Sequence, residues 1–177
     1  MGLEAVEIVL AAEETFGISI PDEAATEMLT PSDLIDFIVS HVSTVPTEGC
    51  VTQQMFYRLR RGFRLQVPAL IQTFDPDTEL TSVVHKDQWP RVWTAVRDSV
   101  GESGWPESIA WPGLLRDGPK TVRQLIWHLV ASMPLPKNGE AWTKTRVEAE
   151  VRRIIADVLG EKDFRLSAKF VGELGVS

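Results

Sequence analysis

The sequence predicts an all-α chain of short amphipathic helices joined by long loops. Three observations support this fold class. Apolar residues recur every three or four positions, helix caps and stops flank these runs, and no segment keeps the strict alternation of a strand. The chain has 177 residues, of which 44% are hydrophobic and 24% charged. This is the balance of a globular protein with room for one ordinary domain or two small ones.

Three helices are expected in residues 1–45. The first ends at Gly17, and a short second helix begins near Pro21. The third starts with Thr30 as its cap, and Pro31 and Asp33 lie in its first turn. The first helix is expected to bury one side, formed by Leu3, Val6, Val9, Leu10 and Phe16.

Further helices are expected in the rest of the chain. Two of them cover "TQQMFYRLRRGFRLQ" and "WPRVWTAVRDSVG", and a short one follows Trp105-Pro106-Glu107. The next, "TVRQLIWHLVASM", has Thr121 and Gln124 in capping-box spacing. The last helix has Thr145 and Glu148 in the same spacing. Its apolar stripe consists of Val147, Val151, Ile154, Val158 and Leu159.

The composition argues against several classes of protein. The single cysteine, Cys50, excludes an internal disulfide framework and suits a reducing, cytoplasmic location. No apolar run approaches the roughly 18 residues that a membrane span needs. His41, His85 and His128 lack the spacing of metal ligands. Because no phosphate loop or nucleophile motif is present either, a non-enzymatic protein without a metal is expected.

Charge is distributed unevenly along the chain. Ten acidic residues and no lysine or arginine precede Gly49. The remaining 15 acidic and 18 basic residues give Gly49–Ser177 a net charge of +3, and the whole chain carries -7. The first segment is therefore expected to favour basic protein partners and to repel nucleic acid. A plain solvated surface also accounts for part of this pattern.

Two short similarities within the chain indicate a repeated unit. "TPSDLIDFIV" and "TVRQLIWHLV" share T-x-x-x-L-I-x-x-[IL]-V. "SAKFVGELG" resembles "DTELTSVVH", pairing Phe170 with Leu80 and Leu174 with Val84. The middle of the chain contains both halves of such a unit, and the two ends contain the same halves in the reverse order.

The two ends of the chain together resemble an acyl carrier protein. At the front, "LEAVEI", Phe16-Gly17 and Ile20-Pro21-Asp22-Glu23 match the family's V-E-[LI] step and its F-G-x-x-I-P-D-E motif. At the back, "EAEVRRIIADVLG…LSAKFVGELG" is similar to the family's first helix and following loop. The resemblance covers roughly 45 residues at the front and 33 at the back, close to the length of one small domain.

The resemblance implies two small four-helix bundles. Residues 1–45 plus 143–177 form a circularly permuted carrier-like bundle. Residues 50–134 form a degenerate carrier-like bundle inserted into it, and residues 135–142 are a linker. A domain-swapped dimer, in which the last helix completes a neighbouring chain, is the alternative to packing within one chain.

The family attaches 4′-phosphopantetheine to a serine at the start of its second helix. Gly2 stands at that position here, and Gln88 stands there in the middle unit. Neither residue has a hydroxyl, so no attached cofactor is expected. Ser177, which joining of the ends would bring near the motif, is the alternative attachment site.

The resemblance also implies a docking role for the acidic helix. Glu4, Glu7 and Glu14 are the expected partner-binding acids, with apolar contacts from Leu3 and Ile8. The leading hypothesis is a non-enzymatic carrier-like module that binds a basic protein of fatty acid or polyketide-type metabolism. One alternative is a working acyl carrier protein, and another is an acyl or lipid binding protein that uses the Trp-rich middle.

An arginine cluster in the middle segment has a further possible role. Arg58, Arg60, Arg61 and Arg64 could hold a phosphate or an acidic partner, including the chain's own front half. A solvated helix face is the alternative.

Overall fold

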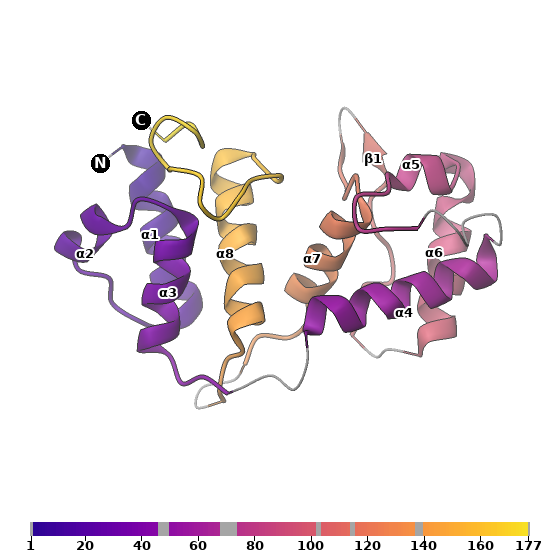
Figure 1. Cartoon of the computed structure of the whole chain (residues 1–177), viewed down its shortest axis with the longest axis horizontal. Helices are drawn as coiled ribbons and strands as arrows, with labels where there is room; N and C mark the ends of the chain where they lie inside the picture. Colours follow the sequence, from indigo (N-terminus) through magenta and orange to yellow (C-terminus); the bar gives the residue numbers. More distant parts are fainter. Residues whose placement is uncertain are drawn as a thin grey trace. The chain divides into compact units, whose positions relative to one another are not determined.

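The computed structural model describes residues 2–45, 50–67, 74–101, 104–113, 116–136 and 140–176. The chain divides into two compact units. Unit 1 combines Met1–Thr47 with Pro136–Ser177, and unit 2 is Glu48–Leu135. The described residues are mostly helical (Figure 1), as the sequence predicts. None of their helices is long and apolar enough to cross a membrane.

Unit 1 is built from four helices. These are α1 (Leu3–Phe16), α2 (Asp22–Glu27), α3 (Pro31–His41) and α8 (Lys144–Leu159). The last helix, α8, packs against α1 and α3 although about 100 residues separate it from them in sequence (Figure 1). The segments before residue 48 and after residue 135 therefore share one core.

The core of unit 1 uses one face of each long helix. Its buried side chains include Ile8, Ala12, Phe16, Leu34, Ile35, Ile38, Val147, Val151, Ile154 and Ile155. Trp142 belongs to the same core, with its ring centroid 4.7 Å from that of Phe16. The inward side predicted for α1 is therefore wrong at Leu3, Val6 and Leu10, which are exposed. The buried ridge of α1 follows Ile8, Ala12 and Phe16 instead, because small Ala12 fits where the neighbouring helices approach.

Of the two helix N-caps predicted in unit 1, that of α3 is confirmed and that of α8 is wrong. Thr30 is the N-cap of α3, as predicted, and it forms a capping box with Asp33. The predicted cap of the last helix at Thr145 is wrong, since the hydroxyl of Thr143 accepts the N–H of Arg146 and caps α8. The backbone of Trp142 pairs with Ser43 and Val45. This pairing orients the chain just before Thr143, so the helix begins earlier than the sequence pattern indicates.

Unit 2 contains α4 (Val51–Gln66), α5 (Leu80–Val83), the 3₁₀ turn η2 (Lys86–Gln88), α6 (Trp89–Val100) and α7 (Val122–Ser132). A two-stranded ribbon, β1 (Pro112–Gly113) and β2 (Arg116–Asp117), lies between α6 and α7. Helix α4 packs against both α6 and α7. Helices α4 and α6 approach closely at Gly62, where an added Cβ atom would lie 2.8 Å from Cγ1 of Val96.

Tryptophan rings fill much of the core of unit 2. Trp89 stacks on Trp93 and Trp93 on Trp105, with ring centroids 6.2 and 5.7 Å apart. The indole N–H groups of Trp89 and Trp93 donate to the carbonyls of Ile109 and Pro106. The short helix predicted after Pro106 is absent from the described residues 104–113. Those two carbonyls are bonded to indole groups of α6 instead of to a helical backbone.

A distinctive pair of backbone hydrogen bonds holds the start of α3. The N–H of Phe170 donates to the carbonyl of Leu29 over 3.0 Å. The N–H of Ser32 donates to the carbonyl of Leu166, also over 3.0 Å. The two bonds flank the N-cap Thr30 and attach the C-terminal segment to α3.

The start of α7 in unit 2 has the same pair of bonds at the same sequence offsets. The N–H of Leu80 donates to the carbonyl of Lys120 over 2.9 Å. The N–H of Arg123 donates to the carbonyl of Pro76 over 2.7 Å. These bonds flank the N-cap Thr121, whose hydroxyl accepts the N–H of Gln124.

The packing partners of the helices also correspond between the units. Helix α8 contacts α1 and α3, and α4 contacts α6 and α7. In the chain, α4 precedes its two partners, whereas α8 follows its own. The two units therefore have matching contacts and a different order of segments.

Candidate functional site

Three segments of unit 1 meet near the start of α1. They are the first turns of α1, the link between α2 and α3, and the C-terminal segment 160–176. The C-terminal segment is irregular apart from short turns, and Gly172 and Gly175 adopt φ values of 92° and 80° that favour glycine. The N–H of Val176 returns to the carbonyl of Phe170 over 3.0 Å, closing these turns into a compact loop.

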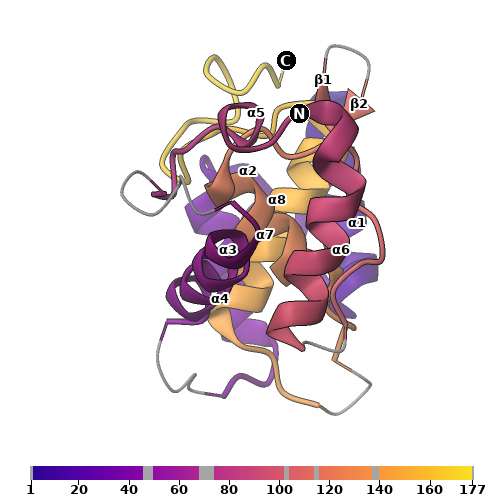
Figure 2. The same cartoon turned by 90° about the vertical axis from the view of Figure 1, so that its right-hand side faces the viewer.

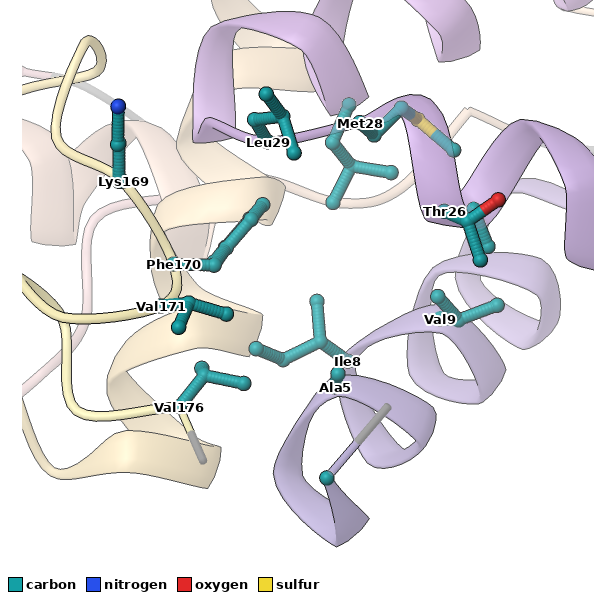
Figure 3. Close-up of a pocket in the computed structure, with 13 residues that line it drawn as sticks. Ala5, Ile8, Val9, Thr26, Met28, Leu29, Lys169, Phe170, Val171 and Val176 are labelled. Carbon is teal, nitrogen blue, oxygen red and sulfur yellow. The ribbon is translucent and has the colours of Figure 1, made fainter.

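A pocket of about 300 Å³ lies between these three segments. Figure 3 shows Ile8, Phe170 and Val176 pointing toward one another across it. Its walls are Gly2, Ala5, Ile8, Val9, Ala25, Thr26, Met28, Leu29, Leu34, Lys169, Phe170, Val171 and Val176. Only Thr26 and Lys169 among these have polar side chains, so the pocket suits an apolar group.

The two chain ends lie close to this pocket. Gly2 and Val176 both line it, and the marks of the N- and C-termini are near each other in both views (Figures 1 and 2). The sequence does not predict the pocket, because its walls come from segments that are more than 120 residues apart.

The rim of the pocket exposes apolar side chains. Leu29 is 58% exposed and Val171 is 69% exposed, although both line the pocket. Leu3, in the first turn of α1, is 76% exposed. Exposed apolar groups that gather around a concave site are typical of surfaces that bind a ligand or a protein.

The outer face of α1 combines acidic and apolar side chains. Leu3, Glu7, Leu10 and Glu14 follow one another at four- and three-residue spacing, and all four are exposed. We call this set the α1 stripe. Glu4 lies beside it and is partly exposed. Within the described part of the chain, the side chains of Glu7 and Glu14 have no ion pair or hydrogen bond.

Two neighbouring residues of α1 point elsewhere. Ile8, expected to contact a partner from the outer surface, is only 3% exposed and lies at the floor of the pocket. That placement on the surface is wrong, because residue 8 falls on the buried ridge with Ala12. Glu13 has a structural role, since its Oε1 atom accepts the N–H of Ile20 over 2.7 Å after the turn at Gly17.

The two residues that the resemblance aligns with the family's attachment serine both lie at helix N-caps. Gly2 is the N-cap of α1 and Gln88 is the N-cap of α6. An exposed N-cap suits a phosphate electrostatically. However, a phosphodiester link to the protein needs a side-chain oxygen, and neither residue has a hydroxyl, so these positions do not fit the covalent group. Ser177 lies outside the described residues.

Other candidate residues are placed apart from this site. The buried Trp89, Trp93 and Trp105 pack in the core of unit 2. His41 stacks on Phe37, and His85 lies 3.4 Å from Asp87 at the surface. Among the described residues, no group of three or more His, Cys, Asp or Glu could hold a metal.

Comparison with known proteins shows a similarity over part of the chain. A segment of 41 residues is 46% identical to the acyl carrier protein of Thermosynechococcus vestitus (strain NIES-2133 / IAM M-273 / BP-1). That segment is 23% of this chain and 51% of the relative, so the match spans about half of the relative's length. No family model matches the chain. No solved structure matches it either.

Proposed function

We propose that unit 1 is a non-enzymatic, acyl-carrier-protein-like module that binds a protein partner through the outer face of α1. The observation that carries this proposal is the α1 stripe, in which Leu and Glu alternate beside an apolar-rimmed pocket. The 46% identity over 41 residues to an acyl carrier protein supports the family assignment. The matched length is about that of the segment 1–45, which carries the family motifs.

We also propose that the chain contains two carrier-like bundles, with the first circularly permuted around the second. The matching hydrogen bonds at Thr30 and Thr121 support a shared architecture. The equivalent packing of α8 and α4 supports the correspondence between the last helix and the start of unit 2. In this assignment α8 supplies the helix that comes first in the family, and it packs within its own chain.

The module is proposed to function without the phosphopantetheine arm. At the two helix starts, neither Gly2 nor Gln88 has a side-chain hydroxyl to which the phosphate could be transferred. Intact-mass measurement after incubation with coenzyme A and a phosphopantetheinyl transferase tests this step. An unchanged mass is expected. A gain of one phosphopantetheine, on Ser177 or elsewhere, would instead identify a working carrier.

The proposed partner is a basic-surfaced protein of fatty acid or polyketide-type metabolism. Exposed ion pairs contribute under about 1 kcal/mol each, so apolar contacts with Leu3 and Leu10 must supply the rest of the affinity. Binding should weaken as salt rises, because the Debye length shrinks from about 10 Å at 0.1 M to about 3 Å at 1 M.

A capture experiment from the native lysate tests the partner-binding role. The variant Glu4→Gln/Glu7→Gln/Glu14→Gln removes three charges and nearly preserves side-chain shape. It should stay folded and lose the captured protein, identified by mass spectrometry. The matched control is Asp22→Asn/Glu23→Gln/Glu27→Gln, which removes three exposed charges from α2. If the wild type, the α1 variant and the α2 control capture the same protein equally, the α1 stripe is an ordinary solvated surface.

A second candidate function is the binding of an acyl chain or another apolar ligand in the pocket of unit 1. The pocket volume of about 300 Å³ and its apolar walls favour this location over the buried tryptophans of unit 2. A fluorescent fatty acid whose emission rises in apolar surroundings tests it. Ala5→Leu, which fills the pocket, should abolish the signal, and Ala24→Leu outside the pocket should not. No signal with the wild-type chain would dismiss this function.

A further inference from the structure

Unit 2 has a second exposed stripe, on α4. Tyr57, Arg61 and Arg64 follow one another at four- and three-residue spacing, and Tyr57 is 54% exposed. We call these three residues the α4 stripe. The opposite face of α4, with Met55, Leu59 and Phe63, is buried in unit 2. The stripe therefore faces away from the core of unit 2.

The charge of this stripe is not balanced within its own helix. Helix α4 contains four arginines and no acidic residue. Neither Arg61 nor Arg64 has an ion pair or a side-chain hydrogen bond among the residues that the structure describes. Two exposed guanidinium groups next to an exposed tyrosine form a surface that favours carboxylates.

An acidic protein helix fits this surface better than a nucleic acid does. The α4 stripe presents two arginines, Arg61 and Arg64, whereas a nucleic-acid site depends on contacts to a longer run of phosphates. A helix with the same residue spacing and the opposite charge would match it directly. The α1 stripe repeats at the same four- and three-residue spacing and carries the opposite charge, with Glu7 and Glu14 between and beside Leu3 and Leu10.

We propose that the α4 stripe of one copy binds the α1 stripe of a second copy of this chain. Positions that repeat at four- and three-residue spacing form the seam along which two helices pack. Along such a seam Tyr57 would contact the exposed leucines, and Arg61 and Arg64 would pair with Glu7 and Glu14. The proposal rests on the partner-binding role of α1 given above, and it adds a second copy of this chain as a further ligand of the α1 stripe.

The contact joins different surfaces of the two copies, so it is head-to-tail. One helix stripe on each side buries less area than a standard interface, and the association should accordingly be weak and reversible. Its rate and affinity should fall with ionic strength, since the arginine–glutamate pairs at its edges are exposed to solvent.

Sedimentation velocity of the full chain at low salt, across a wide range of concentrations, tests the proposal. The weight-average mass should rise above the 19.8 kDa of one chain and return to it at high salt. Arg61→Glu/Arg64→Glu and Glu7→Arg/Glu14→Arg should each remain at the mass of one chain. An equimolar mixture of the two variants should associate again, because each supplies the charge that the other has lost.

Two matched variants control for net charge. Arg91→Glu/Lys120→Glu makes the same charge change at exposed sites of unit 2, and Glu23→Arg/Glu27→Arg does so on α2. Both should associate as the wild type does. A wild-type chain that stays single at all concentrations overturns self-association but leaves capture of another protein by α1 intact. Failure of the mixture to associate, or binding of a labelled single-stranded RNA that depends on Arg61 and Arg64, also overturns it.

Discussion

The backbone N–H of Phe170 donates to the carbonyl oxygen of Leu29 over 3.0 Å, joining the C-terminal segment to the start of α3. Leu80 makes the equivalent bond to Lys120 in unit 2 over 2.9 Å. The sequence similarity that pairs Phe170 with Leu80 therefore corresponds to a shared hydrogen bond. The two side chains differ in burial, since Leu80 is fully buried and Phe170 only partly.

This difference predicts the relative cost of truncating the two side chains. Leu80→Ala should destabilise unit 2 by about 2–5 kcal/mol, the range for buried leucines. Phe170→Ala should cost unit 1 less, about 1–2 kcal/mol, because much of its ring borders the open pocket rather than the core. Urea unfolding followed by amide hydrogen exchange assigns each loss to its unit. A larger loss for Phe170→Ala would contradict the observed burial.

Removal of residues 143–177 should unfold unit 1 and spare unit 2. Helix α8 contributes Val147, Val151, Ile154 and Ile155 to the core of unit 1. Each contributes about 1.5–3 kcal/mol on burial, so the loss of all four, about 6–12 kcal/mol, is comparable with the whole stability of an ordinary domain. Amide exchange should show lost protection in α1 and α3 and retained protection in α4 and α6. A truncated chain with protected α1 amides would show that unit 1 does not need α8.

Two adjacent glutamates of α1 should differ in their effect on stability. Glu13 accepts the N–H of Ile20, whereas Glu14 is exposed without a side-chain bond in the described residues. Glu13→Ala should therefore cost about 1–3 kcal/mol, and Glu14→Ala should stay within about 0.5 kcal/mol. Thermal unfolding of the two variants measures the difference. Equal midpoints would show that the bond to Ile20 contributes nothing.

Two threonines near the start of α8 test where that helix begins. Thr143 caps α8 through its hydroxyl. Thr143→Ala should destabilise unit 1 by about 0.5–2 kcal/mol. Thr145→Ala, inside the first turn, should be nearly neutral or slightly stabilising, because alanine has the higher helix propensity. If chemical denaturation shows a larger loss of stability for Thr145→Ala than for Thr143→Ala, Thr145 is the cap of α8.

The sequence by itself determined the helical class and several helix ends. Thr30 with Asp33 marks the start of α3, and Gly17 marks the end of α1. These signals can be read from the sequence because they depend on hydrogen bonds and backbone angles within a few residues. The same locality made the capping role of Thr121 predictable.

The tertiary structure decided which face of each helix is buried and where the pocket lies. Leu3 and Leu10 looked like core residues, yet the neighbouring helices cover Ile8 and Ala12 instead. Helix α8 begins at Lys144, earlier than predicted, because the backbone of Trp142 pairs with Ser43. The pocket exists because Phe170 and Val176 return to the start of α1. Each of these outcomes depends on contacts between segments far apart in the chain, and the spacing of residues within one segment carries no information about such contacts.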